Sequence, residues 1–168
     1  MSSNNELVDY SIHEAAHAVI AEKLGFYVNG IRVNVDVSDG EQAGSVDVVL
    51  DESREAAIVY AAGEAGDFRN AEAVKRWNSR SVWKGLPRET MSYYPTMSGQ
   101  DAAGVGRYLR ANYYYGKTEL NRIRAEARRM VWDNWYEITN VASALVDASR
   151  GFDSAKLDRA GFLAALNK

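Results

Sequence analysis

The residues with the clearest chemical meaning lie near the start of the chain, in the pentapeptide His13-Glu14-Ala15-Ala16-His17. Two histidines four positions apart on a helix project from one face, so both imidazole rings can reach a single metal ion. They are the only histidines in the sequence. Glu14 lies where its carboxylate can approach a metal-bound water without ligating the metal. The pattern predicts His13 and His17 as zinc ligands and Glu14 as a catalytic general base.

This arrangement suits the hydrolysis of a peptide bond. Zinc lowers the pKa of its bound water towards about 7 and polarises the scissile carbonyl group. Glu14 would take a proton from that water and deliver it to the leaving amine. The alternative is that both histidines are solvated or satisfied in the core and bind no metal. The helical setting of the motif favours the metal site.

A catalytic zinc ion usually has three protein ligands and one position for water. The chain has no cysteine and no third histidine, so the third ligand must be a carboxylate. Asp and Glu together number 23, and composition does not rank them. The lack of cysteine also excludes disulfides and thiolate chemistry, and it leaves the redox compartment open.

The composition is typical of a soluble globular protein. The chain has 168 residues, 46% of them hydrophobic, and Pro and Gly form no linker, so we expect one domain over 1–168. A formal net charge of -3 argues against binding to nucleic acid or to an anionic membrane. The polar N-terminal segment does not have the pattern of a secretory signal, and no apolar run approaches the roughly 20 residues that span a bilayer. We therefore expect a cytoplasmic protein without a membrane span.

Helical and strand patterns along the chain predict a mostly α fold with a small β-sheet, of the α+β class. The HExxH motif falls on a helix predicted over 11–24, with Gly25 at its C-terminal cap. Alternating apolar residues then predict a two-stranded hairpin or meander, with 43–49 as the edge strand. We expect the other helices at 52–68, 101–114 and 118–148, and in a short final segment that Asp153 or Ser154 caps.

Residues 78–100 contain both prolines of the chain and show no persistent period, which predicts a loop or lid. The loop carries the aromatic residues Trp83, Tyr93 and Tyr94. These rings could cover the cleft or bind a partner, or they could fill the core or an oligomer interface.

Several segments resemble one known family. The helix sequence IHEAAHAVIAEKLG is similar to the HEAGH-containing helix of FtsH-type ATP-dependent zinc peptidases, and IVYAAGEAGDF is similar to their Gly-rich LLGGRxAE helix. MSGQDAAGVGRYLRANYYYG resembles their SGAxNDLxxATxxARxMVxxxG segment, and the rest of the chain has the pattern of their long C-terminal helices. The resemblance covers most of the chain and implies an FtsH peptidase-like helical domain.

The resemblance also implies a third zinc ligand. In that family the aspartate of the SGAxND segment ligates zinc, and the matching position here is Asp101. The alternative for Asp101 is a helix cap or a first-turn carboxylate that the helix dipole stabilises. The predicted ligands are therefore His13, His17 and Asp101. Asp67 could orient a ligand histidine, but we expect it to be an exposed carboxylate at a helix end.

The chain departs from the family pattern in three places. It has no GxxxxGK[ST] loop, Glu64 stands where the family has arginine, and Gln100 stands where it has asparagine. We expect an ATP-independent, stand-alone zinc endopeptidase acting on peptides or unfolded proteins, which could bind along the edge strand. A homo-oligomer is left open. The alternatives are a weakly active or inactive binding or regulatory module acting through a protein partner, and hydrolysis of a non-peptide amide.

Overall fold

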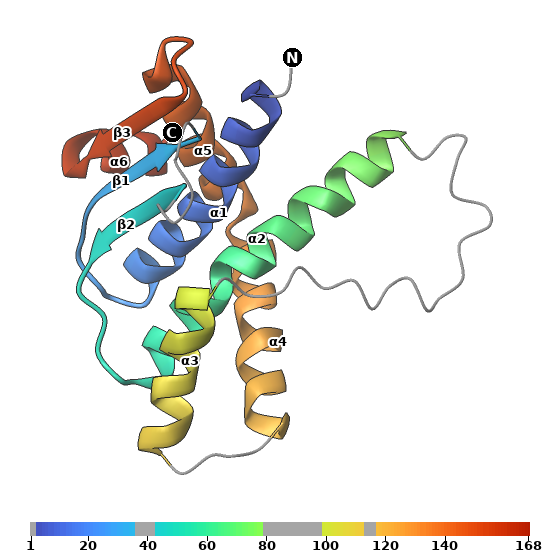
Figure 1. The fold of residues 1–168 in the computed structure, drawn as a ribbon, viewed down its shortest axis with the longest axis vertical. Coiled ribbons are helices and arrows are strands. Elements are labelled where there is room, and N and C mark those ends of the chain that lie inside the picture. The colour runs from blue at the N-terminus through green and yellow to red at the C-terminus, as the bar shows by residue number, and fades with distance from the viewer. Residues whose placement is uncertain (1–2, 36–42, 79–98, 113–116) are drawn as a thin grey trace.

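The computed structural model describes residues 3–35, 43–78, 99–112 and 117–168. The chain is mostly helical with one small sheet, which confirms the α+β class (Figure 1). The elements are, in order, α1 (Ser3–Lys23), β1 (Val28–Asn34), β2 (Gly44–Val48), α2 (Arg54–Asn78), α3 (Gly99–Ala111), α4 (Lys117–Asp133), α5 (Trp135–Ser149), β3 (Ser154–Asp158) and α6 (Arg159–Leu166).

Helix α1 lies at the centre of the fold. It packs against α2, α5 and the sheet, so every residue from 14 to 21 is buried. A helix that is covered on all sides is expected to be apolar all round. Within 14–21 only Glu14 and His17 are polar. Burying polar groups is costly without partners. The burial of Glu14 and His17 therefore indicates a functional site here, independently of the HExxH sequence pattern.

Helices α1 and α2 approach each other closely because their contact is made of small residues. A Cβ atom on Gly66 of α2 would lie 2.9 Å from the Cβ atom of Ala16 in α1. Buried alanines flank this point on both helices: Ala15 and Ala18 on α1, Ala62 and Ala65 on α2. The close approach brings the backbone of α2 next to the histidines of α1.

The sheet is antiparallel, with strand order β2-β1-β3. Strand β2 therefore lies at an edge, as predicted for 43–49, and among the described residues it pairs with β1 alone. Strand β3 was not predicted, because Asp153 or Ser154 was expected to cap the final helix. Its burial alternates, with Ala155 and Leu157 inward, and this period of two defines a strand. The true cap is Asp158, whose side chain accepts a hydrogen bond from the Gly161 amide.

The single helix predicted over 118–148 is wrong. It is interrupted at Asn134, which separates α4 from α5 and has φ -110°. The Asn134 side chain donates to the Met130 carbonyl oxygen at 2.8 Å, and such bonds compete with the helical backbone. Arg69 of α2 stacks over Trp132 and Trp135, one on each side of the break. The apolar stripe continues across the interruption, so periodicity did not reveal it.

Two helices are longer than predicted. Helix α1 begins at Ser3 rather than at residue 11, and α2 continues to Asn78 rather than to residue 68. The added turns contain fewer apolar residues than the predicted parts, although Leu7 near the start of α1 is buried in the core. Trp83, Tyr93 and Tyr94 of the predicted loop or lid lie outside the described residues. In the ranges that the structure describes, no helix combines the length and apolarity needed to cross a bilayer.

Candidate metal centre

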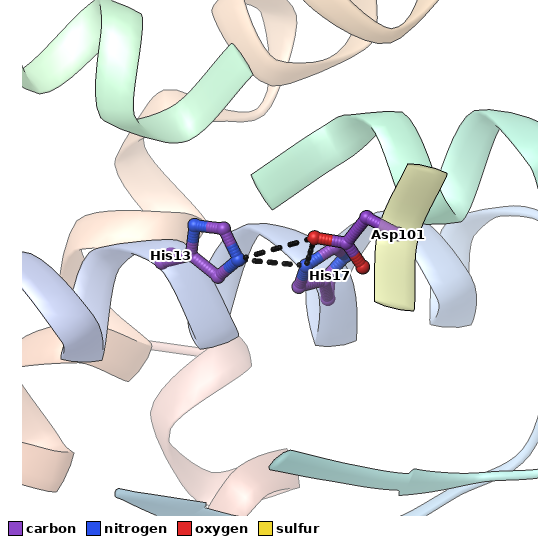
Figure 2. A group of neighbouring side chains, drawn as sticks. All are labelled: His13, His17 and Asp101. Carbon is purple, nitrogen blue, oxygen red and sulfur yellow. Dashed lines mark hydrogen bonds and ion pairs between the residues drawn. The ribbon is translucent and has the colours of Figure 1, made fainter. Parts of the chain in front are cut away.

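Three predicted ligand residues meet at one point, although α1 supplies two of them and α3 supplies the third (Figure 2). The Nε2 atoms of His13 and His17 lie 3.1 Å apart. The same oxygen, Oδ2 of Asp101, lies 3.5 Å from Nε2 of His13 and 3.4 Å from Nε2 of His17. His13, His17 and Asp101, hereafter the ligand group, can therefore hold a metal ion.

The spacing of these three atoms fits a tetrahedral zinc ion. Ligand atoms at about 2.0 to 2.1 Å from zinc, at tetrahedral angles, lie about 3.3 Å from one another. The three observed separations, 3.1, 3.4 and 3.5 Å, scatter closely around this value. Two imidazole nitrogens and one carboxylate oxygen also form a donor set that zinc accepts at catalytic sites. The chemistry and the geometry of the group both fit the predicted ion.

Both histidine rings are held through their other nitrogen. Nδ1–H of His17 donates to the backbone carbonyl of Val59 at 2.7 Å. A carbonyl oxygen can only accept, so this bond fixes the proton on Nδ1 and leaves the Nε2 lone pair for a metal. Nδ1–H of His13 donates in the same way to Asp67 at 2.8 Å. Helix α2 thus orients both ligand rings of α1.

The expectation that Asp67 is an exposed carboxylate at a helix end is wrong. Helix α2 continues for eleven residues beyond it, to Asn78, and the side chain of Asp67 is 34% exposed. The predicted helix end at residue 68 placed Asp67 in the last turn, whereas the observed helix continues and places it in the middle of α2. The sequence offered the orienting role only as an alternative, because no local pattern shows that residue 67 faces His13.

The surroundings of the ligand group stabilise a positive charge between its three side chains. Burial disfavours a charged imidazole, but the interactions of His13 with Asp101 and Asp67 outweigh it and raise the pKa of His13 to about 10. Burial likewise opposes protonation of His17, and Asp101 again outweighs it and raises the pKa. Facing lone pairs and a carboxylate repel one another unless a proton or a cation lies between them. A divalent cation would supply the same positive charge.

Glu14 lies at the same cleft as the ligand group and is only 7% exposed. Burial raises the pKa of its carboxyl group, because a carboxylate loses solvation there, and His17 and His13 oppose that rise. A carboxyl group with a raised pKa binds a proton more readily than an exposed glutamate does, which suits a group that must take up and release one.

Two glycines keep the space that these side chains occupy, and sequence analysis did not identify either. A Cβ atom on Gly63 of α2 would lie closer than 3.0 Å to the Nε2 atoms of both His13 and His17. A Cβ atom on Gly44 of β2 would lie equally close to the carboxylate of Glu14. Glycine within a helix or strand is unfavourable without a packing reason, and here the reason is the site.

The cleft beside the ligand group is open to one edge of the sheet. Gly44 and Ser45 of β2 line it near Glu14, and Gln100 lines it next to Asp101. Its apolar wall is formed by Val46, Val48, Leu50, Val59 and Tyr60. Binding clefts commonly combine such an apolar lining with a few polar groups that fix orientation.

Glu64, the residue that sequence analysis compared with an arginine of the FtsH-type pattern, contacts α4 and is not one of the three residues that could hold a metal ion. It pairs with Arg124 of α4 at 3.2 Å and is 5% exposed. Burial raises the pKa of Glu64, and Arg124 opposes that rise. Its role in the described structure is to join α2 to α4.

A comparison with protein-family models found no match to this chain, and a search among curated proteins found none either. The geometry of the site is therefore what supports a function for this chain.

Proposed function

We propose that this protein is a zinc-dependent peptidase that hydrolyses peptide bonds with Glu14 as general base. The observation that carries the proposal is the convergence of the ligand group beside a buried glutamate at an open cleft. Three protein ligands leave one tetrahedral position for water or substrate, which is the pattern of catalytic rather than structural zinc sites.

Each residue has one role in this proposal. When bound, zinc would polarise the scissile carbonyl and lower the pKa of a water molecule. Glu14 accepts a proton as the water oxygen adds to the carbonyl carbon, and it passes that proton to the amine as the C–N bond breaks. Asp67 and the carbonyl of Val59 hold the histidine rings in position throughout. Such supporting bonds commonly change metal affinity by 10- to 100-fold.

The substrate that this site favours is an extended chain. Strand β2 borders the cleft and lies at the sheet edge, so its backbone can pair with a peptide that adds as a further strand. The apolar wall next to it would receive an apolar side chain. Folded proteins rarely present such a segment. We therefore propose unfolded proteins and peptides as substrates.

Kinship with FtsH-type peptidases remains part of the proposal. It is supported by the chain order of the HExxH helix, the glycine-containing helix α2 and the helix α3 that begins near Asp101. This order is the one that the sequence resemblance implies.

A cleavage assay tests the function. Zinc-loaded wild type, Glu14→Gln and the exposed control Glu52→Gln are incubated with a reduced, alkylated and fluorescently labelled protein. Wild type and Glu52→Gln should cleave it at equal rates, and Glu14→Gln should retain zinc but cleave at least about 100-fold more slowly. Equal rates for wild type and Glu14→Gln would exclude the mechanism. Binding of the substrate by zinc-loaded wild type without cleavage would instead support a binding or regulatory module.

A further inference from the structure

Asp101 differs from the other ligands because it comes from a separate helix. His13 and His17 are fixed relative to each other by one turn of α1, whereas Asp101 lies in the first turn of α3. Within the described chain α3 packs chiefly against α2 and only slightly against α4 (Figure 1). The distance from Asp101 to the histidines therefore depends on how α3 is seated on α2.

The contact between α3 and α2 is centred on a glycine and a tyrosine ring. Gly104 follows Asp101 by one turn and is buried against the ring of Tyr60 in α2. A Cβ atom at position 104 would lie closer than 3.0 Å to three ring carbons of Tyr60. Glycine destabilises a helix interior relative to alanine. At position 104 it is nevertheless suited to the fold, because only a residue without a Cβ atom lets α3 approach the ring of Tyr60 this closely.

Arg107, one turn further along α3, contacts Tyr60 from another side. Its Nη2 donates to the Tyr60 hydroxyl at 2.9 Å, and its guanidinium carbon lies 5.5 Å from the ring centroid. Asp101 and Gly104 are buried and three positions apart, which places them on one face of the helix, and Arg107 reaches Tyr60 from the adjoining exposed face. The face that contacts Tyr60 is thus the face that carries the ligand.

Tyr60 is also adjacent in sequence to Val59, whose carbonyl holds the ring of His17. The same turn of α2 therefore orients His17 and also contacts α3, the helix that carries Asp101. We propose that Tyr60 is a positioning residue for the metal centre: through Gly104 and Arg107 it sets the position of α3 and thereby the distance of the Asp101 carboxylate from the two histidines. This inference rests on the metal binding assumed in the proposed function.

The test uses two glycines of the same helix. Gly104→Ala would push α3 away from Tyr60, whereas a Cβ atom at Gly106 would meet only the flexible end of Arg110, at 3.3 Å. Both changes raise helix propensity equally. Zinc dissociation constants are measured by competition with a chromophoric chelator, and the Co²⁺ absorption spectrum reports coordination geometry. We expect Gly104→Ala to bind zinc at least tenfold more weakly than Gly106→Ala and to alter the cobalt spectrum.

A double-mutant cycle distinguishes positioning from general packing. If Gly104 acts through Asp101, Gly104→Ala should weaken zinc binding in wild type but have almost no further effect in Asp101→Ala. Equal dissociation constants for Gly104→Ala and Gly106→Ala, or additive effects in the cycle, would overturn the inference.

A second pair of variants covers the case in which Gly104→Ala does not fold. Arg107→Ala removes one side of the Tyr60 contact at the surface, and Arg110→Ala is its exposed control on the same helix. Arg107→Ala should weaken zinc binding two- to fivefold relative to Arg110→Ala, and equal binding would contradict the inference. Failure of wild type to bind zinc would instead overturn the proposed function, so the two failures are distinguishable.

Discussion

The carboxylate of Asp67 accepts a hydrogen bond from Nδ1 of His13 at 2.8 Å, and this bond joins the middle of α2 to the HExxH helix. It fixes which nitrogen of His13 is free to face a metal, and it places a negative charge behind the ring. Both effects strengthen a histidine as a ligand. The relationship makes Asp67 part of the candidate metal centre, although Asp67 itself is not one of the three residues that could hold the ion.

Asp67→Ala should therefore weaken zinc binding by roughly 10- to 100-fold, because the ring of His13 loses both its orientation and its carboxylate partner. Asp153→Ala, which removes an exposed carboxylate in a turn before β3, is the control for loss of charge. Zinc dissociation constants of the two variants, measured side by side, check the prediction. Similar constants would show that the Asp67 contact does not support the site.

Gly63→Ala should remove metal binding with a smaller effect on the fold. The new methyl group would fall on the Nε2 atoms of both histidines, where it blocks the metal position. Overpacking of this kind commonly costs about 1 to 3 kcal/mol of stability. Zinc titration followed by urea unfolding of the metal-free protein measures both quantities. Zinc binding by Gly63→Ala as tight as that of wild type would contradict the metal position beside these two Nε2 atoms.

Zinc affinity should rise with pH through the neutral range. The pKa of His13 is raised to about 10 and that of His17 is also raised, so the pair tends to hold a proton between its two Nε2 atoms, and zinc must displace it. Each displaced proton tightens binding by about tenfold per pH unit below the pKa of its ring. Chelator competition at pH values between about 6 and 9, in steps of about one unit, would measure how the zinc dissociation constant changes with pH. A dissociation constant that does not change with pH would contradict the protonation described for these rings.

The part of the site that lies on one helix could be predicted from the sequence, because residue spacing on a helix fixes direction. His13, Glu14 and His17 belong to one turn, and their separation alone places both rings on one face. Asp101 could be selected from 23 carboxylates only through the resemblance to FtsH-type peptidases. No local pattern indicates that the first turn of α3 reaches the motif helix.

The remaining features depend on contacts between elements that are distant in the sequence. The importance of Gly63 and Gly104 depends on which side chains lie opposite them, and Asp67 was misjudged because the helix was predicted to end at residue 68. Strand β3 has only two inward residues, too few for alternation to be recognised. At the interruption at Asn134, Arg69 of α2 stacks on aromatic rings on both sides of the break. This contact comes from another helix, so the sequence of α4 and α5 alone gives no sign of it.

The zinc content of the purified protein tests the central claim most directly. Wild type, Glu14→Gln, His17→Ala and Asp101→Ala are dialysed against zinc-containing and then zinc-free buffer, and the metal is measured by mass spectrometry. Because Glu14 is not a ligand, wild type and Glu14→Gln should each retain about one zinc ion per chain. His17→Ala and Asp101→Ala should retain much less. Wild type without zinc, or Asp101→Ala with the zinc content of wild type, would contradict the assignment of the ligand group.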